Sequence, residues 1–369
     1  MRTYRIGCIP GDGVGPDVVA VGLRVLAAAA ELEGFRYELI SYPYSGAHYL
    51  ATGELVPDRA LEEWRSLDAV FLGAIGHPAV EPGLVERAVI LGLRVGLDLY
   101  ANVRPVKLLA DELCPIKGKR CADVDFVVVR ENTEDVYTQI GGHFKTGTAD
   151  EVAVVTGLYT RRGTERVIRY AFDRARERAR QRSGVLPRSR VTMVDKANAI
   201  RPHSLWTRVF AEVATEYPEV AADHLYVDAC CMRMIQAPEH FDVIVTTNLF
   251  GDILTDLGAM LQGGMGMAAS GNIHPGRTSM FEPVHGAAPD IAGKGIANPT
   301  AAVLSVAMML EHLGEPAAAR RIEGTVERVV KQEGAAFDPR GNRPSTAAIG
   351  DWFEAELRSA AVPAGAGAS

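Results

Sequence analysis

Two aspartates, Asp252 and Asp256, lie four positions apart in the segment NLFGDILTDLGAM (248–260), directly after the apolar run FDVIVTT (241–247). Four helical positions turn the chain by about 400°, so both carboxylates would project from nearly the same face of a helix. Like charges at this spacing repel each other on an isolated helix. The pair therefore lies on a solvated face or has a positive group between its members, and the apolar, glycine-rich surroundings favour the positive group.

A third acid, Asp228, follows another apolar stretch in YVDACCMRM (226–234). Open α/β sheets bind ligands at the carboxyl ends of their strands, which is where Asp252 and Asp256 are expected. Carboxylates without a cluster of cysteine or histidine suit a hard cation, Mg²⁺ or Mn²⁺. The three aspartates are therefore candidate metal ligands.

Three arginines, Arg94, Arg104 and Arg130, fall near the ends of predicted strands or helices. A guanidinium group binds a carboxylate through two parallel hydrogen bonds, so three of them beside one metal ion would suit a di- or tricarboxylate substrate. A single arginine would more often be a surface charge. As a set, they indicate an anionic small molecule.

Two further side chains could move a proton. Lys196 ends a predicted buried strand. A metal ion and arginines nearby would disfavour its charged form, which makes it a candidate proton acceptor. The alternative for Lys196 is a structural pairing with Asp195 or another acid. Tyr137, in ENTEDVYTQIGG (131–142), could donate a proton, or it could pack in a core or an interface.

The elements that would hold these residues alternate between strand and helix. Short apolar runs predict buried strands at 4–10, 68–76, 125–132, 190–198 and 241–248. Amphipathic stretches predict helices at 16–34, 162–183, 203–217 and 250–262, and then at 299–314, 316–333 and 345–359. This alternation predicts an α/β fold with a largely parallel sheet covered by helices.

Length and composition exclude several classes of protein. The 369 residues favour two domains, and 47% apolar residues are enough for a sizeable core. With a net charge of −7 and no basic stripe, the chain is not expected to bind nucleic acid, and no apolar stretch predicts a membrane span. Without an export signal or paired cysteine motifs, we expect a cytoplasmic protein, and the small residues at 360–369 predict a flexible tail.

The glycine-rich segment GDGVGP (11–16) lies between the first predicted strand and the first predicted helix. It departs from the dinucleotide-binding fingerprint because its third glycine comes one position early. It is therefore either a tight turn that needs glycine dihedrals or a wall of a different nucleotide pocket.

Six segments make the chain similar to the β-decarboxylating dehydrogenases, the family of isocitrate, isopropylmalate, homoisocitrate and tartrate/D-malate dehydrogenases. The resemblance runs from about residue 4 to residue 335 and is strongest to the isopropylmalate branch. It is carried by IPGDGVGPDV (9–18), DLYANVRP (98–105), VVRENTEDVY (128–137), DKAN (195–198), TTNLFGDILTDLGAML (246–261) and FEPVHGAAPDIAGKGIANPTAAVLS (281–305). It implies a two-domain open α/β fold that binds its cofactor without a standard Rossmann domain.

The resemblance also implies roles for the residues above. Asp228, Asp252 and Asp256 would bind Mg²⁺ or Mn²⁺, Arg94, Arg104 and Arg130 would hold the carboxylates of a hydroxy-dicarboxylate substrate, and Lys196 and Tyr137 would be the acid/base pair. The nicotinamide cofactor would be bound by Asn198, Glu282, His285, Gly286, Asp290 and Asn298. Because the carboxylate of Asp290 would accept hydrogen bonds from the adenosine ribose and repel a 2′-phosphate, we expect NAD rather than NADP.

Substrate selectivity in this family lies in the helix that here reads PGLVERAVILGLR (82–94). Ala88 and Ile90 stand where isocitrate enzymes offer polar residues, so isocitrate is disfavoured. Ile90 and Leu91 favour an apolar substituent, as in 3-isopropylmalate, although core packing explains part of this apolar run. Arg87 stands where most isopropylmalate enzymes carry an acid. A polar substituent, a tartrate, D-malate or homoisocitrate activity, and a paralogue from a specialised pathway therefore stay open.

The family architecture implies a cofactor-binding domain from 1–108 and 262–369 and a central substrate and dimerisation domain from 109–261, with the active site between them. Relatives take the lysine and one metal-binding aspartate from the neighbouring subunit. Lys196 and Asp228 are therefore expected to act across a homodimer with shared active sites. From the residues alone, two other classes stay open: a metal-dependent phosphoryl-transfer enzyme and a non-catalytic binding protein.

Overall fold

The computed structural model describes residues 3–181, 189–338, 341 and 344–359. The chain divides into two compact units: unit 1 comprises Met1–Leu99, Leu108–Cys121 and Ala259–Ser369, and unit 2 comprises Tyr100–Lys107 and Ala122–Gly258. These limits differ from the predicted ones at 100–107, 109–121 and 259–261, and the first difference arises because the strand at 101–107 pairs with a strand of unit 2. The predicted tail at 360–369 and the predicted helix end at 182–183 lie outside the described residues.

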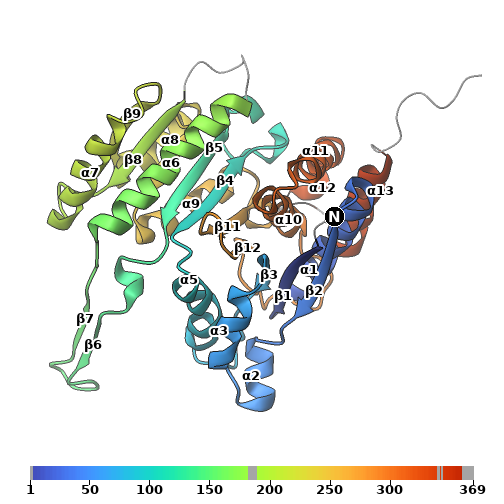
Figure 1. Cartoon of the computed structure of the whole chain (residues 1–369), viewed down its shortest axis with the longest axis horizontal. Helices are drawn as coiled ribbons and strands as arrows, with labels where there is room; N and C mark the ends of the chain where they lie inside the picture. The colour runs from blue at the N-terminus through green and yellow to red at the C-terminus, as the bar shows by residue number, and fades with distance from the viewer. Residues whose placement is uncertain (1–2, 182–188, 339–340, 342–343, 360–369) are drawn as a thin grey trace, which may run out of the picture. The chain divides into compact units, whose positions relative to one another are not determined.

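Unit 1 is built on five strands in the order β2-β1-β3-β12-β11, in which only β11 and β12 pair antiparallel. Helix α1 packs against α10, α11 and α13, and α10 packs on β3, β11 and β12 (Figure 1). The strands are β1 (Thr3–Gly11), β2 (Arg36–Ser41), β3 (Ala69–Ala74), β11 (Ala269–Ile273) and β12 (Ser279–Pro283). The helices are α1 (Gly15–Glu33), α2 (Gly46–Thr52), α3 (Asp58–Arg65), α4 (Leu84–Glu86), α5 (Gly92–Gly96), α10 (Thr300–Leu313), α11 (Pro316–Gln332), α12 (Gly334–Phe337) and α13 (Thr346–Ser359).

Unit 2 has five strands in the order β4-β5-β10-β8-β9, in which only β4 and β5 pair antiparallel. Helix α6 packs on β5, β8 and β10, and a two-stranded hairpin of β6 and β7 projects from the rest of this unit (Figure 1). The strands are β4 (Ala101–Lys107), β5 (Asp125–Glu131), β6 (Gly141–Phe144), β7 (Val152–Val155), β8 (Arg190–Asp195), β9 (Ala221–Tyr226) and β10 (Val243–Thr246). The helices are α6 (Arg161–Gln181), α7 (Ser204–Ala214), α8 (Val227–Gln236) and α9 (Asn248–Leu261).

Local sequence explains these elements. Pro16 lies in the first turn of α1, where no backbone N–H is needed, and Gly34 ends the helix with a φ of 77°, a left-handed conformation that suits glycine. Strands β3 and β10 are buried at every residue, as in sheets covered on both faces.

The predicted α/β class with a mostly parallel sheet is confirmed, and each predicted strand and helix is present with its described ends within three residues of the expected ones. The antiparallel pairs and the β6–β7 hairpin were not predicted. Among the described residues, no helix combines the length and the apolar character that crossing a membrane would need.

Candidate active site

Helix α9 begins where β10 ends, and it carries both acids of the opening motif. Strand β10 is buried along its whole length, whereas the side chains of Asp252 and Asp256 are 41% and 56% exposed. The chain thus leaves the core and at once places two carboxylates at the carboxyl end of a parallel strand. This is the edge at which α/β sheets bind ligands.

Positively charged groups lie between and beside these carboxylates. Of the two interpretations of the motif, a solvated helix face or a positive group between the acids, the second therefore holds. Arg104 of β4 places Nη2 3.9 Å from Asp252 Oδ1 and Nη1 3.8 Å from Asp256 Oδ1. Arg130 of β5 donates a hydrogen bond to Asp252 Oδ1. Both arginine side chains are buried. Unit 2 therefore brings two of the three predicted arginines to two of the three predicted metal ligands.

Tyr137 joins the same cluster. Its hydroxyl donates a hydrogen bond to Asp252 Oδ2 at 2.9 Å, and the guanidinium carbon of Arg130 lies 5.1 Å from the centre of its ring. Helix α9 can approach this closely because of Gly251, where a Cβ would lie 2.4 Å from Arg130 Cγ. The predicted proton donor is thus in contact with a predicted metal ligand.

Their surroundings shift the pKa values of the two acids in opposite directions. Burial raises the pKa of Asp252, but the charges of Arg130 and Arg104, together with hydrogen bonds from Tyr137 and Arg130, outweigh burial and hold this pKa below its ordinary value. Burial lifts the pKa of Asp256 above its ordinary value, against the charge of Arg104 and with the help of the Asp252 carboxylate. An added cation would favour the charged forms of both acids.

Lys196 and Asp228 form a separate pair. Lys196 directly follows β8, Asp228 lies in the first turn of α8, and Lys196 Nζ donates a 2.5 Å hydrogen bond to Asp228 Oδ1. This hydrogen bond lowers the pKa of Asp228, whose side chain is 63% exposed. Over the part of the chain that the structure describes, no three acidic, cysteine or histidine side chains gather as a metal-binding group.

In unit 1, Arg94 is paired with Glu282. Arg94 Nη2 lies 3.1 Å from Glu282 Oε1, which also accepts a 2.8 Å hydrogen bond from Asn272 Nδ2. All three side chains are buried. Glu282, expected at the cofactor, is thus positioned to orient the guanidinium group of Arg94, and Asn272 is a partner that sequence reasoning missed.

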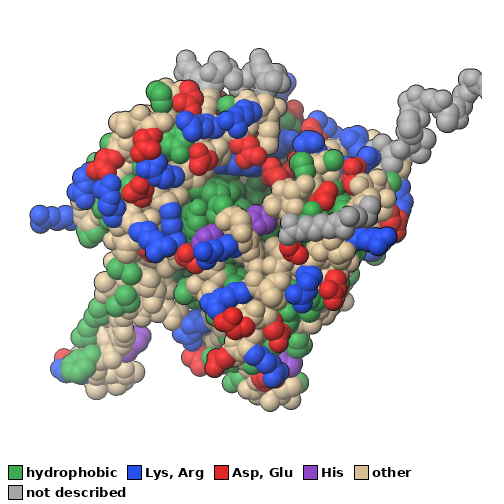
Figure 2. All heavy atoms as spheres, viewed as in Figure 1, with side chains coloured by type: hydrophobic (Ala, Val, Ile, Leu, Met, Phe, Trp, Pro, Cys, Tyr) green, Lys and Arg blue, Asp and Glu red, His purple; other side chains and the backbone are tan. Residues whose placement is uncertain are grey.

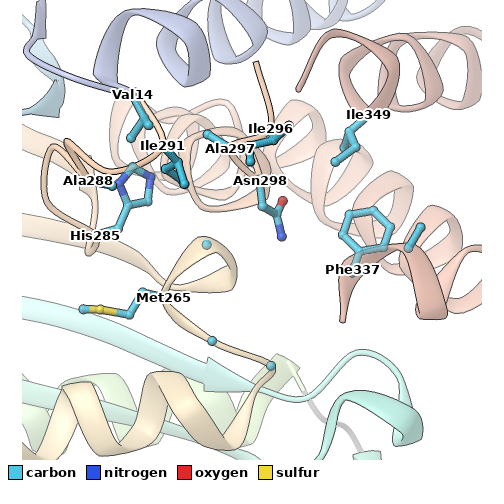
Figure 3. A pocket seen from close by; sticks show the side chains of 14 residues that line it. Val14, Met265, His285, Ala288, Ile291, Ile296, Ala297, Asn298, Phe337 and Ile349 are labelled. Atoms are coloured by element: carbon cyan, nitrogen blue, oxygen red, sulfur yellow. The ribbon is translucent and has the colours of Figure 1, made fainter. Parts of the chain in front are cut away.

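A cavity of about 240 Å³ in unit 1 is lined by two of the predicted cofactor residues, His285 and Asn298 (Figure 3). His285 Nδ1 donates a 3.0 Å hydrogen bond to the carbonyl oxygen of Gly286, so Nε2 carries the lone pair of the neutral ring. Burial lowers the pKa of His285. Nε2 is buried and meets no hydrogen-bond partner among the described residues. An N–H donor of a bound molecule would satisfy it.

The glycine-rich turn forms one wall of this cavity through Val14. The backbone N–H of Val14 donates a 2.9 Å hydrogen bond to the carbonyl oxygen of Ala287. Gly13 has a φ of 59°, and a Cβ at this position would lie 1.9 Å from that same oxygen. The turn is therefore a pocket wall, and glycine is needed because the 285–298 loop approaches it so closely.

The remaining predicted cofactor residues do not line the cavity. Gly286 and Asp290 are exposed on the same loop, and Asn198 is exposed near Lys196 in unit 2. Most of the residues that line the cavity were not predicted from the sequence. The glycine-rich segment 261–267, which contributes four of them, was the one sequence feature that could have indicated the cavity. The missed lining residues are Gly263, Gly264, Met265, Gly266, Ala288, Ile291, Ile296, Ala297, Ala336, Phe337 and Ile349.

The predicted selectivity residues lie on one turn of π-helix, η1 (Arg87–Leu91), between α4 and α5. Ile90 packs, partly buried, against the core of unit 1, so part of its apolar character serves packing. Leu91 is half-buried and Arg87 is exposed. Leu91 is therefore the stronger candidate for contact with a substrate substituent.

Known proteins resemble this chain over nearly its whole length. A family profile described as isocitrate/isopropylmalate dehydrogenase matches residues 5–352. The 3-isopropylmalate dehydrogenase of Thermobifida fusca is 47% identical over 353 residues, which cover 95% of this chain and 96% of that protein. The 3-isopropylmalate dehydrogenase of Streptomyces coelicolor is 46% identical over 361 residues, which cover 96% and 99%. The crystal structure of isocitrate dehydrogenase from Methylococcus capsulatus matches with a TM-score of 0.85 and 40% identity, covering 96% of this chain and 99% of that chain.

Proposed function

The chain belongs to the isocitrate/isopropylmalate dehydrogenase family, and we propose that it oxidises and decarboxylates 3-isopropylmalate with NAD and a divalent cation. Membership makes it a β-decarboxylating dehydrogenase of a small-molecule substrate. The proposed product is 2-oxo-4-methylpentanoate. The observation that carries the proposal is the cluster in unit 2, where Asp252 and Asp256 meet Arg104, Arg130 and Tyr137.

Mg²⁺ or Mn²⁺ fits this cluster by its donor set. Asp252 and Asp256 offer carboxylate oxygens from one helix, both partly exposed, and hard divalent cations prefer such ligands. A cation held by both carboxylates would offset the repulsion between Asp252 and Asp256. When bound, the ion would supply Lewis-acid polarisation of the oxygen on the substrate's second carbon.

The side chains around the acids bind the substrate and move its protons in this proposal. Arg104 and Arg130 hold substrate carboxylates through charge-assisted hydrogen bonds, and Arg94, oriented by Glu282, is proposed as the third such group. NAD⁺, when bound, would supply the hydride acceptor, and Lys196 would accept the proton of the substrate hydroxyl. Carbon dioxide then leaves without the electrons of its C–C bond, and Tyr137 supplies the proton that completes the product.

A homodimer would bring Lys196 and Asp228 to a second subunit. Unit 2 exposes apolar side chains on its hairpin, on α8 and on α9, and Figure 2 shows hydrophobic atoms along the projecting hairpin. Such patches mark interaction surfaces. On α8, Met232 is 59% exposed and lies one helical turn from Asp228. The exposed apolar residues of unit 2 at the hairpin, on α8 and on α9 are Ile140, Phe144, Val152, Val154, Val155, Met232, Ile235 and Ile253. We expect a dimer in sedimentation velocity, and a fully active monomer would contradict shared sites.

NAD is the proposed occupant of the cavity in unit 1. Its walls carry apolar side chains such as Val14 and Ile291 that suit a base, and the Nε2 lone pair of His285 could accept a hydrogen bond from the amino group of adenine. Asp290, next to Ile291, is exposed and would accept hydrogen bonds from ribose hydroxyls but repel a 2′-phosphate. We expect kcat/KM for NAD to exceed that for NADP at least about tenfold, and the reverse preference would contradict this assignment.

The test is NADH production from 3-isopropylmalate, tartrate, D-malate, isocitrate and homoisocitrate with Mn²⁺ or Mg²⁺. We expect 3-isopropylmalate to give the highest kcat/KM, by at least about tenfold over the others. A preference for another of the five would replace the substrate and keep the chemistry. No NADH from any of them would overturn the proposal, and turnover of a nucleoside triphosphate would identify a phosphoryl-transfer enzyme instead.

A further inference from the structure

Asp135 is a buried carboxylate that takes part in no proposed step. Its side chain is 2% exposed, and its backbone adopts a φ of 69° and a ψ of −154°, a conformation that residues other than glycine rarely occupy. Such conformations persist where surrounding contacts hold them, and they concentrate at functional sites. The carbonyl oxygen of Asp135 accepts a 3.3 Å hydrogen bond from the N–H of Thr138, which closes the turn that carries Tyr137.

The carboxylate of Asp135 joins two other segments of unit 2. Oδ2 accepts a 3.0 Å hydrogen bond from the N–H of Leu249, in the first turn of α9. Oδ1 accepts a 2.6 Å hydrogen bond from the hydroxyl of Tyr159. Asp135 therefore ties the Tyr137 turn to the helix of Asp252, and it holds the ring of Tyr159 by its hydroxyl end.

The ring of Tyr159 packs edge-on against His203, with ring centres 4.8 Å apart at 80°. Phe250 of α9 also contacts the His203 ring, at 5.6 Å and 75°. The His203 side chain is 1% exposed. Its Nδ1 accepts a 3.1 Å hydrogen bond from the backbone N–H of Lys196, so the proton of the neutral ring lies on Nε2.

The backbone of Lys196 is thereby held on both sides. Its carbonyl oxygen accepts hydrogen bonds from the N–H groups of Ala199 and Ile200 at 2.9 and 2.7 Å, and its own N–H donates to His203. Only the side chain extends outward, to Asp228. The ring of His203 therefore helps to fix the backbone from which the Lys196 side chain extends.

We propose that Asp135, Tyr159 and His203 form a positioning network that fixes the backbone of Lys196 relative to Tyr137 and helix α9. The effect of this network on catalysis rests on the proposed function, in which Lys196 and Tyr137 move protons. Helix α9 carries the acids of one site, whereas Lys196 of the same subunit serves the other site of the proposed homodimer. A disturbance of the network would therefore reach both sites.

The first test compares two substitutions of His203 in the full-length protein. His203→Asn keeps an acceptor oxygen close to the position of Nδ1, whereas His203→Leu keeps bulk and removes the acceptor. Hydrogen–deuterium exchange at the Lys196 amide reports the bond directly. We expect exchange at least about tenfold faster in His203→Leu and within about threefold of the unmodified protein in His203→Asn. This readout needs no enzymatic activity.

The second test is kinetic. We expect His203→Leu to lower kcat by roughly tenfold or more while KM for NAD stays within about twofold, and His203→Asn to restore most of kcat. Tyr159→Phe should also lower kcat and weaken Mn²⁺ binding, measured by electron paramagnetic resonance, because Asp135 then holds α9 less firmly. Tyr217→Phe is the matched control, since it removes a 3.1 Å tyrosine–aspartate hydrogen bond to Asp173 in the same unit.

The outcomes separate the network from the proposed function. Equal exchange at Lys196 in the Leu and Asn variants, or unchanged kcat in His203→Leu and Tyr159→Phe, would overturn the positioning network. If the unmodified enzyme formed no NADH from any of the five substrates, the proposed function would fail, and the exchange experiment would still decide whether His203 holds Lys196. Thermal unfolding of each variant shows whether a loss is global, and Tyr159→Phe, which removes the hydrogen bond to Asp135, still tests the network if His203→Leu does not fold.

Discussion

The hydroxyl of Tyr137 donates a 2.9 Å hydrogen bond to Oδ2 of Asp252. One contact thus orients both the proposed proton donor and a proposed metal ligand. We predict that Tyr137→Phe lowers kcat for NADH formation by about 10²–10⁴-fold, because the proton that completes the product loses its donor. Mn²⁺ affinity should change by less than about tenfold, since the carboxylates remain.

Tyr217→Phe is again the control for loss of a tyrosine–aspartate hydrogen bond in unit 2, and it should retain normal turnover. A kcat for Tyr137→Phe within about threefold of the unmodified enzyme would remove Tyr137 from proton transfer.

Asp252 lies beside the guanidinium groups of Arg104 and Arg130 and is a proposed metal ligand, so its loss should affect metal binding. Chelation should abolish turnover, and Mn²⁺ should restore it. Asp252→Asn should weaken Mn²⁺ binding at least about tenfold, because the substitution removes a negative charge and one ligand oxygen. Mn²⁺ titration followed by electron paramagnetic resonance measures this. Asp173→Asn, at a side chain 64% exposed in the same unit, is the control, and equal Mn²⁺ affinity in both variants would contradict the site.

Gly13 and Gly34 offer a matched pair at positive φ. Both would strain an alanine, with φ of 59° and 77°, but a Cβ at Gly13 would lie 1.9 Å from the carbonyl oxygen of Ala287, whereas nothing lies within 4 Å of one at Gly34. We predict that Gly13→Ala raises KM for NAD at least about fivefold because it displaces the loop that lines the cavity.

Gly34→Ala should destabilise the protein by about 1 kcal/mol and leave KM unchanged, because only backbone strain is added. Steady-state kinetics with NAD as the varied substrate and urea unfolding of both variants provide the comparison. An unchanged KM in Gly13→Ala would show that this wall does not shape the cofactor site.

The features that could be predicted from the sequence are those that depend on residues close together in the chain and on local apolar runs. Asp252 and Asp256 share a helix, and the strand before them is an unbroken apolar run, so their placement at a sheet edge followed from a few residues. The Tyr137–Asp252 and Arg94–Glu282 contacts join residues 115 and 188 positions apart. Such contacts depend on how distant strands pair, and no local pattern specifies that.

The same reasoning explains the missed elements. Strands β6 and β7 are exposed at every residue, so they show none of the alternation that marks a half-buried strand. Strand β4 contains Pro105, which lowers the expectation of a strand, and it pairs antiparallel with β5 in a sheet expected to be largely parallel. In the sequence, Phe337 and Ile349 cannot be distinguished from core residues. Only the fold shows that they border a cavity.

Glu131 links the stability of unit 2 to pH. The side chain is 1% exposed, and burial raises its pKa from 4.5 to about 7, although hydrogen bonds from Thr133 and Glu134 oppose the rise. A carboxyl group with a raised pKa favours folding while protonated, so its contribution is complete below pH 4.5 and is lost as pH rises through 7. The expected loss is on the order of 2–4 kcal/mol between these limits.

Glu131→Gln removes this titration. The substitution also changes the hydrogen bond that Oε2 accepts from the N–H of Glu134, which shifts stability by a constant amount at every pH. Urea unfolding of both proteins from pH 4.5 to pH 8 therefore gives a difference in unfolding free energy whose slope isolates Glu131. We predict that the variant gains relative stability as pH rises, with most of the change between pH 5 and 7. A difference that stays constant over this range would show that Glu131 is already ionised in the folded protein at pH 5, held so by the three hydrogen bonds it accepts.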